Sequence, residues 1–330
     1  MSKLKMTLGC WGYDRTNALK DGSVTPDGID LNFLDMSVEE TFFRMLRHKE
    51  FDAAEMSMSS YTVTMFDENR PFIAIPVFPS RIFRHSAIFI NKNSGIKEPK
   101  DLVGKRVGCP EYQMTAPVWI RGIMSDEYGV PVDSVQYMTG GEEEPNRPEK
   151  IPLNLPDNIK VEPIGKDKTL ATMLESGELD ALYTARAPLS FYREDSNIQR
   201  LFPNYTEVER DYFKKTNIFP IMHCVVIRRD IYESNPWVAQ SLLKAFSQAQ
   251  KVTYDNISLT GSPMVMLPWV VSLIEEAKRT MGDDFWPYGF EKNRDTIATF
   301  LRYHYEQGLS QRQLQPEEMF ATESMESFVI

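Results

Sequence analysis

The stretch that organises the chain is Phe78-Pro-Ser-Arg-Ile-Phe-Arg-His-Ser86. It lies between two apolar runs, residues 72–77 and 87–90, and each run is typical of a buried strand. The guanidinium groups of Arg81 and Arg84 therefore stand where two strands meet. Guanidinium groups bind carboxylates in bidentate geometry, so the stretch predicts a binding site for an anion.

The same stretch also contains groups that can exchange a proton or donate a hydrogen bond. His85 follows the second arginine directly, and the hydroxyls of Ser80 and Ser86 flank the cluster. Imidazole is the side chain best suited to proton transfer near neutral pH. The alternative is a surface turn with solvated arginines, because charged residues at strand ends are usually exposed.

Composition limits the classes of protein that this chain can represent. It has 330 residues, 42% hydrophobic and 25% charged, which is enough for two lobes of ordinary size. The net charge of −10 argues against a nucleic-acid or anionic-membrane partner. An arginine cluster in an acidic protein instead favours a small anionic ligand held at short range.

The chain lacks the marks of export or of membrane insertion. The N-terminal residues contain no apolar core of signal-peptide length, and no apolar run approaches the length of a membrane span. Its cysteines are three in number, far apart and without a Cys-x-x-Cys pair, which fits a reducing compartment. We therefore expect a cytoplasmic protein without disulfides.

In the first hundred residues, predicted strands end in polar loops. Residues 4–10 predict a strand that leads into the loop of Tyr13, Asp14 and Arg15, and residues 51–56 predict another that leads into Ser57 and Ser59. Ligands of open α/β sheets bind at such strand ends. The serines could cradle an anion at a helix N-terminus, or simply cap that helix. For Asp14 the alternative to a role in the site is an Asx-turn.

The second part of the chain repeats this order of strand, loop and helix. Gln113 and Thr115 precede a predicted helix over 118–128, and the strand predicted at 180–186 ends in Tyr183, Thr184 and Arg186. Residues 139–156 predict an irregular excursion or lid, and 203–215 a connection. Arg121 is expected to pair with Glu127 or a neighbouring carboxylate.

Histidines outside the organising stretch receive different interpretations. His223 lies in the β-branched run 221–227, where a hydrogen-bonded core histidine and a catalytic one are both open. His48 and His304 lie among charges on predicted helices, so we expect both at the surface. Helices are also predicted over 236–255, 267–281 and 293–308.

Motifs for phosphate, nucleotide and zinc binding are absent, and so is the Gly-x-Ser-x-Gly nucleophile motif. A divalent metal site assembled in space from His85, His223 and a carboxylate stays open. The remaining arginine, histidine, tyrosine and hydroxyl side chains at loop tips fit a small aromatic or carboxylate-bearing anion.

Several polar stretches carry a resemblance to a known family. They are Tyr13-Asp-Arg-Thr16, Gly28-Ile-Asp-Leu-Asn-Phe33, Ile75-Pro-Val-Phe-Pro-Ser-Arg81, Phe83-Arg-His-Ser86, Pro110-Glu-Tyr-Gln-Met-Thr115, Thr139-Gly-Gly-Glu-Glu-Glu-Pro145, Asp180-Ala-Leu-Tyr-Thr-Ala-Arg186, Phe219-Pro-Ile-Met-His223 and Trp286-Pro-Tyr288. Through these stretches the chain resembles the 4,5-dihydroxyphthalate decarboxylase family along nearly its whole length. Departures lie mostly in connecting segments such as 154–160 and 258–266.

The resemblance implies an α/β, two-lobed type 2 periplasmic-binding-protein-like fold with a central cleft and two crossover strands. Lobe 1 would comprise 1–92 and 222–330, and lobe 2 would comprise 93–221. The implied activity is that of a carboxy-lyase without organic cofactor, converting 4,5-dihydroxyphthalate to protocatechuate and carbon dioxide in phthalate degradation. A homo-oligomer is left open.

The resemblance also suggests roles for individual residues. Arg81 and Arg84 would bind the carboxylates, assisted by Arg15 or Arg186, and either His85 or His223 would donate the proton. Tyr13, Asp14 and Tyr183 would lie near the phenolic oxygens. The expected hydrogen-bonding residues are Ser57, Ser59, Ser86, Gln113, Thr115 and Thr184.

Two other functions remain as alternatives. A solute-binding protein for an aromatic carboxylate would share the fold, and fold alone does not decide function. A decarboxylase of the same fold could also act on another phenolic acid.

Overall fold

The structure is a computed structural model that describes residues 2–325. The described residues divide into two compact units: unit 1 comprises residues 2–81, 221–297 and 315–325, and unit 2 comprises 82–220 and 298–314. The resemblance placed the boundaries at 92–93 and 221–222. In this division 82–92 and 298–314 group with the second unit: residues 88–91 pair with strands of that unit, and Gln307 bonds Arg121.

Unit 1 is built on a five-stranded mixed sheet in the order β2-β1-β3-β11-β4. Strand β1 is parallel to β2 and β3, whereas β11 is antiparallel to β3 and β4. The strands are β1 (Leu4–Cys10), β2 (Ile29–Asp35), β3 (Ala53–Ser57), β4 (Phe72–Ile75) and β11 (His223–Arg228). The central strands are apolar and buried, as is typical of a sheet covered on both faces.

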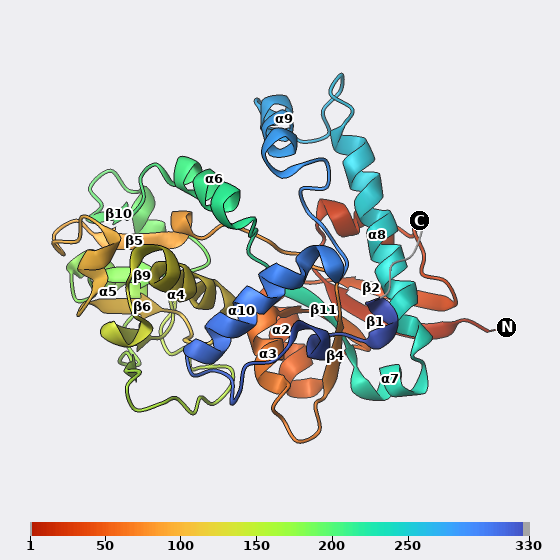
Figure 1. Cartoon of the computed structure of the whole chain (residues 1–330), viewed down its shortest axis with the longest axis horizontal. Helices are drawn as coiled ribbons and strands as arrows, with labels where there is room; N and C mark the ends of the chain where they lie inside the picture. Colours follow the sequence, from red (N-terminus) through yellow and green to blue (C-terminus); the bar gives the residue numbers. More distant parts are fainter. Residues whose placement is uncertain (1, 326–330) are drawn as a thin grey trace. The chain divides into compact units, whose positions relative to one another are not determined.

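The helices that begin in unit 1 include the long α8 (Figure 1), which contacts α1 and the residues just before it, 14–16. They are α1 (Asn17–Lys20), α2 (Val38–His48), α3 (Met58–Thr64), α7 (Arg229–Ser234), α8 (Trp237–Ile257), α9 (Val270–Met281) and α10 (Arg294–Glu306). Ser37 is the N-cap residue of α2, where a serine followed by Glu40 is typical of a capping box, but its side chain makes no capping hydrogen bond within the described residues.

Unit 2 contains a six-stranded mixed sheet in the order β10-β5-β9-β6-β7-β8. Its strands are β5 (Ile88–Asn91), β6 (Arg106–Cys109), β7 (Gln136–Thr139), β8 (Val161–Pro163), β9 (Ala181–Tyr183) and β10 (Ile198–Arg200). Figure 1 shows α4 and α5 against these strands. The α-helices lying wholly in unit 2 are α4 (Thr115–Tyr128), α5 (Leu170–Ser176) and α6 (Tyr205–Thr216).

Short 3-10 helices join these elements. They are η1 (Asp14–Thr16), η2 (His85–Ala87), η3 (Pro99–Leu102), η4 (Val132–Ser134), η5 (Leu189–Tyr192), η6 (Glu291–Asn293), η7 (Pro316–Met319) and η8 (Thr322–Ser324). Residues 140–160 contain neither helix nor strand, which confirms the predicted irregular excursion. The prediction of a connection over 203–215 is wrong, because α6 forms there and buries Tyr212 on one face.

The segment 298–314 is attached to unit 2 by buried polar contacts. Arg121 Nε donates to Gln307 Oε1 at 2.7 Å, and Gln307 Nε2 donates to the carbonyl of Val118 at 2.8 Å. The expected pairing of Arg121 with Glu127 is wrong, because Glu127 forms an ion pair with Lys215 instead. These contacts satisfy polar groups that would otherwise be costly to bury.

His304, in the same segment, is fully buried, and its Nδ1 lies 2.5 Å from Ser310 Oγ. The expected surface position of His304 is therefore wrong, whereas His48 is exposed as expected. All three cysteines are buried free thiols. None of the helices in residues 2–325 combines the length and the apolar character needed to cross a membrane.

Close packing of α4 on α10 requires glycine at position 122. A Cβ atom there would lie 2.1 Å from Cδ2 of the buried Tyr303 ring. In an open helix Gly→Ala is stabilising by about 1 kcal/mol. Here we expect Gly122→Ala to lower the free energy of unfolding by about 1–3 kcal/mol through overpacking, measured by urea denaturation. Ser125→Ala in the same helix is the control, and an equal or greater stability of Gly122→Ala would contradict the packing argument.

Candidate functional site

A buried carboxylate in unit 1 gathers four hydrogen-bond donors. Glu55 lies in the middle of β3 and is fully buried. Its Oε1 accepts from Tyr13 Oη at 2.7 Å and lies 2.6 Å from His223 Nδ1. Its Oε2 accepts from the backbone N–H of Trp11 at 3.2 Å and from Cys10 Sγ at 3.6 Å. The donors come from the end of β1 and from β11, the two strands that flank β3.

The register of the sheet explains why Glu55 and His223 are in contact. His223 is directly opposite Ser57 on the antiparallel β3–β11 pair, so its side chain shares a face with Ser57 and, two residues along, with Glu55. Diagonal neighbours of this kind lie within reach of long side chains. The contact between Glu55 and His223 is therefore a consequence of strand pairing. It could not be inferred from the sequence, because the two residues are 168 positions apart.

Glu55 is held as a carboxylate despite its burial. Burial raises the pKa of this group, but the hydrogen bonds from His223 and Tyr13 outweigh it and leave the pKa below its ordinary value. The phenol of Tyr13 is affected oppositely: burial and the negative charge of Glu55 raise its pKa, so it remains protonated. Tyr13 thus acts as a donor to Glu55.

The position of His223 suits proton transfer. Its side chain is 16% exposed, and its ring packs edge-on against Phe42 at 4.8 Å between centroids. Because an ionised Glu55 binds Nδ1, the proton of the neutral ring is held on that nitrogen. Nε2 is then the nitrogen that can gain and release a proton, with Glu55 as the group that orients the ring.

The neighbouring loop holds Arg15 tightly. Its guanidinium lies over the rings of Tyr13 and Trp286, at 4.0 Å and 4.3 Å, and its Nε donates to the carbonyl of Pro79 at 2.5 Å. Nη1 pairs with Asp14 at 3.0 Å. Asp14 is exposed, and its carboxylate also accepts from the backbone N–H of Arg15 rather than from a residue two positions on.

Ser57 and Ser59 occupy the start of α3. Ser57 Oγ accepts from the backbone N–H of Ser60 at 3.4 Å, which is the capping role that the sequence left open beside anion binding. Ser59 is fully buried.

Arg81 and Arg84 both have buried guanidinium groups that contact backbone carbonyls. Arg81, in unit 1, donates to Pro287 O at 2.9 Å and to the side chain of Asn293. Arg84, in unit 2, donates to Ala185 O at 3.2 Å. Burial lowers the pKa of each to about 9, so both are still cationic at neutral pH. The division of the chain passes between them, and their joint binding of one ligand stays a prediction.

His85 lies in a very different environment from His223. It packs edge-on against Tyr128, Phe202 and Tyr212 of unit 2 and is almost fully buried. Among the described residues neither of its ring nitrogens has a hydrogen-bond partner. Burial lowers its pKa to about 4, so the ring is neutral at pH 7. The backbone N–H of the adjacent Ser86 donates to Glu209 at 2.9 Å.

In unit 2 the expected hydrogen-bonding residues contact buried carboxylates. Gln113 Nε2 donates to Glu111 at 2.8 Å, and Thr184 donates to Glu142. Thr115 is the buried first residue of α4. Tyr183 is buried at the end of β9, whereas Arg186 is exposed. Burial raises the pKa of Glu142 to about 7.

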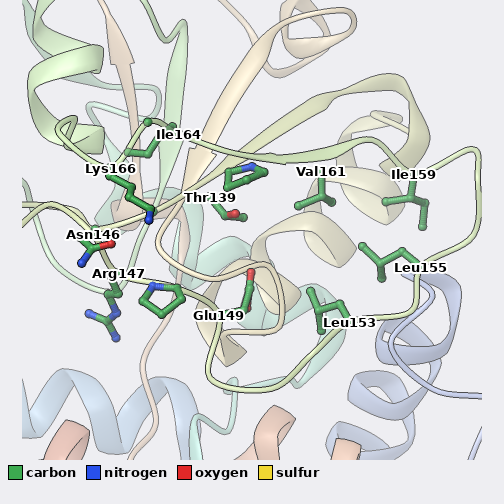
Figure 2. Close-up of a pocket in the computed structure, with 15 residues that line it drawn as sticks. Thr139, Asn146, Arg147, Glu149, Leu153, Leu155, Ile159, Val161, Ile164 and Lys166 are labelled. Carbon is green, nitrogen blue, oxygen red and sulfur yellow. The ribbon is translucent and has the colours of Figure 1, made fainter.

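A cavity of about 510 Å³ lies in unit 2 (Figure 2). It is bounded by the ends of β7 and β8 and by the irregular segment 140–160. Of its lining residues, Thr139 and Gly140–Gly141 belong to a stretch that the sequence singled out. The other lining residues were not predicted to belong to a site. Segment 140–160 has no helical or strand periodicity, so its sequence does not indicate which side chains share a face.

The structure thus joins Tyr13 and His223 through Glu55, and joins Gln113 and Thr184 to two further carboxylates. The site residue that sequence reasoning missed in unit 1 is Glu55. The available signal was a lone carboxylate within the apolar strand 53–57, since such charges are seldom buried unless paired. Within residues 2–325, no three His, Cys, Asp or Glu side chains gather in a way that could hold a metal ion.

Comparisons with known proteins identify relatives over the full chain. No family model matches. A protein of Comamonas testosteroni named 4,5-dihydroxyphthalate decarboxylase is 40% identical over 330 residues, which is 100% of both chains. One of the same name from Pseudomonas putida is 42% identical over 214 residues, covering 65% of this chain and 83% of that protein.

Solved structures show the fold. The periplasmic aliphatic sulphonate binding protein SsuA of Escherichia coli aligns with a TM-score of 0.54 at 14% identity, over 97% of this chain and 98% of that one. The alkanesulfonate-binding protein SsuA of Xanthomonas axonopodis pv. citri, bound to MOPS, aligns with a TM-score of 0.53 at 11% identity, over 97% and 99%. At these identities the likeness concerns the fold alone, which is periplasmic-binding-protein-like.

The aromatic environment of His85 generates a pH prediction. Its pKa is about 4 when folded and about 6.5 when exposed, so the unfolded chain binds more protons between these values. Stability should therefore be greatest above pH 6.5 and fall on acidification, by up to about 1.4 kcal/mol per pH unit. We expect His85→Leu to reduce this loss between pH 7 and pH 5 in denaturant titrations. The exposed His48→Gln is the control, and an unchanged slope in His85→Leu would refute the assignment.

Proposed function

We propose that this chain, which belongs to the 4,5-dihydroxyphthalate decarboxylase family, removes one carboxyl group of 4,5-dihydroxyphthalate and produces protocatechuate and carbon dioxide. Support comes from the relative that is 40% identical over the whole of both chains. The fold by itself would not decide between catalysis and binding.

The chemistry requires an acid and a group that holds it in place. Each carboxylate of the substrate is para to a ring hydroxyl, so loss of that phenolic proton raises electron density on the carbon that bears the carboxylate. That carbon takes a proton from an acid, the bond to the carboxylate breaks, and its electrons return to the ring as carbon dioxide leaves. One proton is consumed for each carboxylate lost.

We assign the acid to His223, and the observation that carries this choice is its contact with Glu55. A buried carboxylate 2.6 Å from Nδ1 holds the ring in one orientation, as a positioned proton donor requires. His85 has no such neighbour, and its pKa of about 4 leaves it without a proton to donate near pH 7. Between the two histidines that the sequence left open, the environment therefore favours His223.

Binding of the two substrate carboxylates is proposed for the arginines that the sequence singled out. Arg81 and Arg84 are cationic and buried, which strengthens their interaction with an anion. Arg15 and Arg186 are candidates to assist them. Because Tyr13 Oη donates to Glu55, we propose that Tyr13 holds the Glu55–His223 pair in place rather than contacting the phenolic oxygens of the substrate. Ser86, Gln113, Thr115, Tyr183 and Thr184 remain candidate contacts.

We also propose that the reaction takes place in the cytoplasm, as a step of phthalate degradation. Three buried free thiols fit a reducing compartment. The net charge of −10 argues against nucleic acid as a partner.

Direct assay tests the function. Purified protein with 4,5-dihydroxyphthalate should release one carbon dioxide and one protocatechuate per turnover, followed by gas detection and chromatography. His223→Gln should lower kcat by roughly 100-fold or more, because a positioned acid contributes about 10²–10⁴-fold. His48→Gln should be unaffected. Tight binding of 4,5-dihydroxyphthalate without product would favour the solute-binding alternative. Product formed only from another phenolic acid would show that this acid, rather than 4,5-dihydroxyphthalate, is the substrate.

The role of Glu55 has a separate test in the split between kcat and KM. Glu55→Gln keeps the size of the side chain but removes the charge that holds the ring of His223 through Nδ1. We expect kcat to fall roughly 10-fold or more with KM little changed, because a positioned acid contributes about 10²–10⁴-fold. Asp30→Asn, on the exposed side of β2, is the control. An unchanged kcat would rule out Glu55 as the group that orients His223.

A further inference from the structure

The cavity in unit 2 has the size of a ligand site. Its volume of about 510 Å³ falls within the range of about 300–1,000 Å³ that small-molecule pockets occupy. It lies wholly within unit 2, between the ends of β7 and β8 and the segment 140–160. The proposed roles of Glu55 and His223 do not use it, since both residues belong to unit 1.

The lining divides into two regions of different chemistry. Figure 2 shows Leu153, Leu155, Ile159 and Val161 along one side of the cavity, with Asn146, Arg147 and Lys166 on the other. Thr139 and Glu149 lie between the two groups. A ligand that matches this arrangement has an apolar body and an anionic end.

Buried ion pairs hold the wall of the cavity in place. The fully buried carboxylate of Glu111 pairs with Arg147 and with Lys150, each at 2.9 Å. Glu149 Oε1 accepts from the backbone N–H of Tyr112 at 2.5 Å. The irregular segment is thereby anchored to the residues that follow β6.

One oxygen of the cavity wall has no partner. Glu149 Oε2 is buried and lacks a hydrogen bond within the described residues. An unsatisfied buried oxygen costs about 1–3 kcal/mol, and its presence calls for an explanation. Burial, with the negative charge of Glu111 adding to it, raises the pKa of Glu149 to about 7. This group can therefore accept from, or donate to, a ligand hydroxyl.

The side of the cavity with Asn146, Arg147 and Lys166 also offers a positive charge that can pair with a ligand. Lys166 is exposed at the mouth of the cavity, and in residues 2–325 no carboxylate lies within ion-pair distance of its ammonium group. Figure 2 shows its side chain extending toward the space that Thr139 and Glu149 face. Arg147, in contrast, is engaged by Glu111.

We propose that this cavity binds a hydroxylated aromatic monocarboxylate. Its ring lies against the apolar side, its carboxylate pairs with Lys166, and a ring hydroxyl meets Glu149 Oε2. The choice of this class rests on the proposed function, whose product, protocatechuate, has all three features.

Calorimetric titration of the full chain with three probes tests the assignment. Protocatechuate carries hydroxyls and a carboxylate, benzoate lacks the hydroxyls, and catechol lacks the carboxylate. Lys166→Gln should weaken protocatechuate at least tenfold and leave catechol unchanged. Glu149→Gln should weaken protocatechuate at least tenfold and leave benzoate unchanged, because the amide oxygen can still accept from Tyr112.

Lys160→Gln and Glu162→Gln are the controls, since both side chains are exposed on the same segment and neither lines the cavity. Equal affinity of wild type, Lys166→Gln and Glu149→Gln for protocatechuate would overturn the proposal, as would an absence of binding by wild type. If Glu149→Gln fails to fold, Lys166→Gln decides, because its side chain is exposed.

The decarboxylation assay on the same samples separates the two proposals. If the protein turns over 4,5-dihydroxyphthalate but Lys166→Gln and Glu149→Gln bind protocatechuate as wild type does, the cavity proposal alone is rejected. If these variants bind protocatechuate more weakly but wild type shows no turnover, the proposed function alone is rejected.

Discussion

The constraint on which unit 1 depends is the burial of one negative charge in the middle of its sheet. The carboxylate of Glu55 is excluded from water, and a buried ion is tolerated only when paired and hydrogen-bonded. Its donors come from the loop after β1 and from β11, so satisfying it ties together three adjacent strands. The interaction that stabilises the charge also fixes the orientation of His223.

Unit 2 uses the same principle in its loops. Glu111 and Glu142 are buried carboxylates whose partners come from distant parts of the chain: Arg147 and Lys150 for one, Thr184 for the other. Through Glu111, a segment without helix or strand is anchored to the end of β6. Irregular backbone can thus form a defined wall, because its polar groups and ion pairs take over the role that regular hydrogen bonding has elsewhere.

The two histidines His85 and His223 show that tertiary contacts, rather than neighbours in the sequence, set the surroundings of an imidazole. His85 stands beside two arginines in the sequence, yet in the fold its ring faces tyrosines and a phenylalanine and has no hydrogen-bond partner within residues 2–325. His223 stands in an apolar run, where a core residue is expected, yet its ring meets a carboxylate. Neighbours along the chain diverge at the turn of η2, whereas strand pairing brings distant residues together. Proximity in sequence was therefore a poor guide to which imidazole has a carboxylate partner.

The sequence by itself determined much of the strand and helix pattern, although not α6, and it determined the α/β class and, through unusual polar stretches, the family. Such features depend on local periodicity and on residues that are neighbours in the chain, as with residues 4–10, found as a strand with the expected bounds. Only the tertiary structure decided that Glu55 meets His223, that Arg121 bonds Gln307 and that 298–314 packs with unit 2. These outcomes depend on sheet register and on the need to satisfy buried polar groups across long sequence separations, which no local pattern encodes.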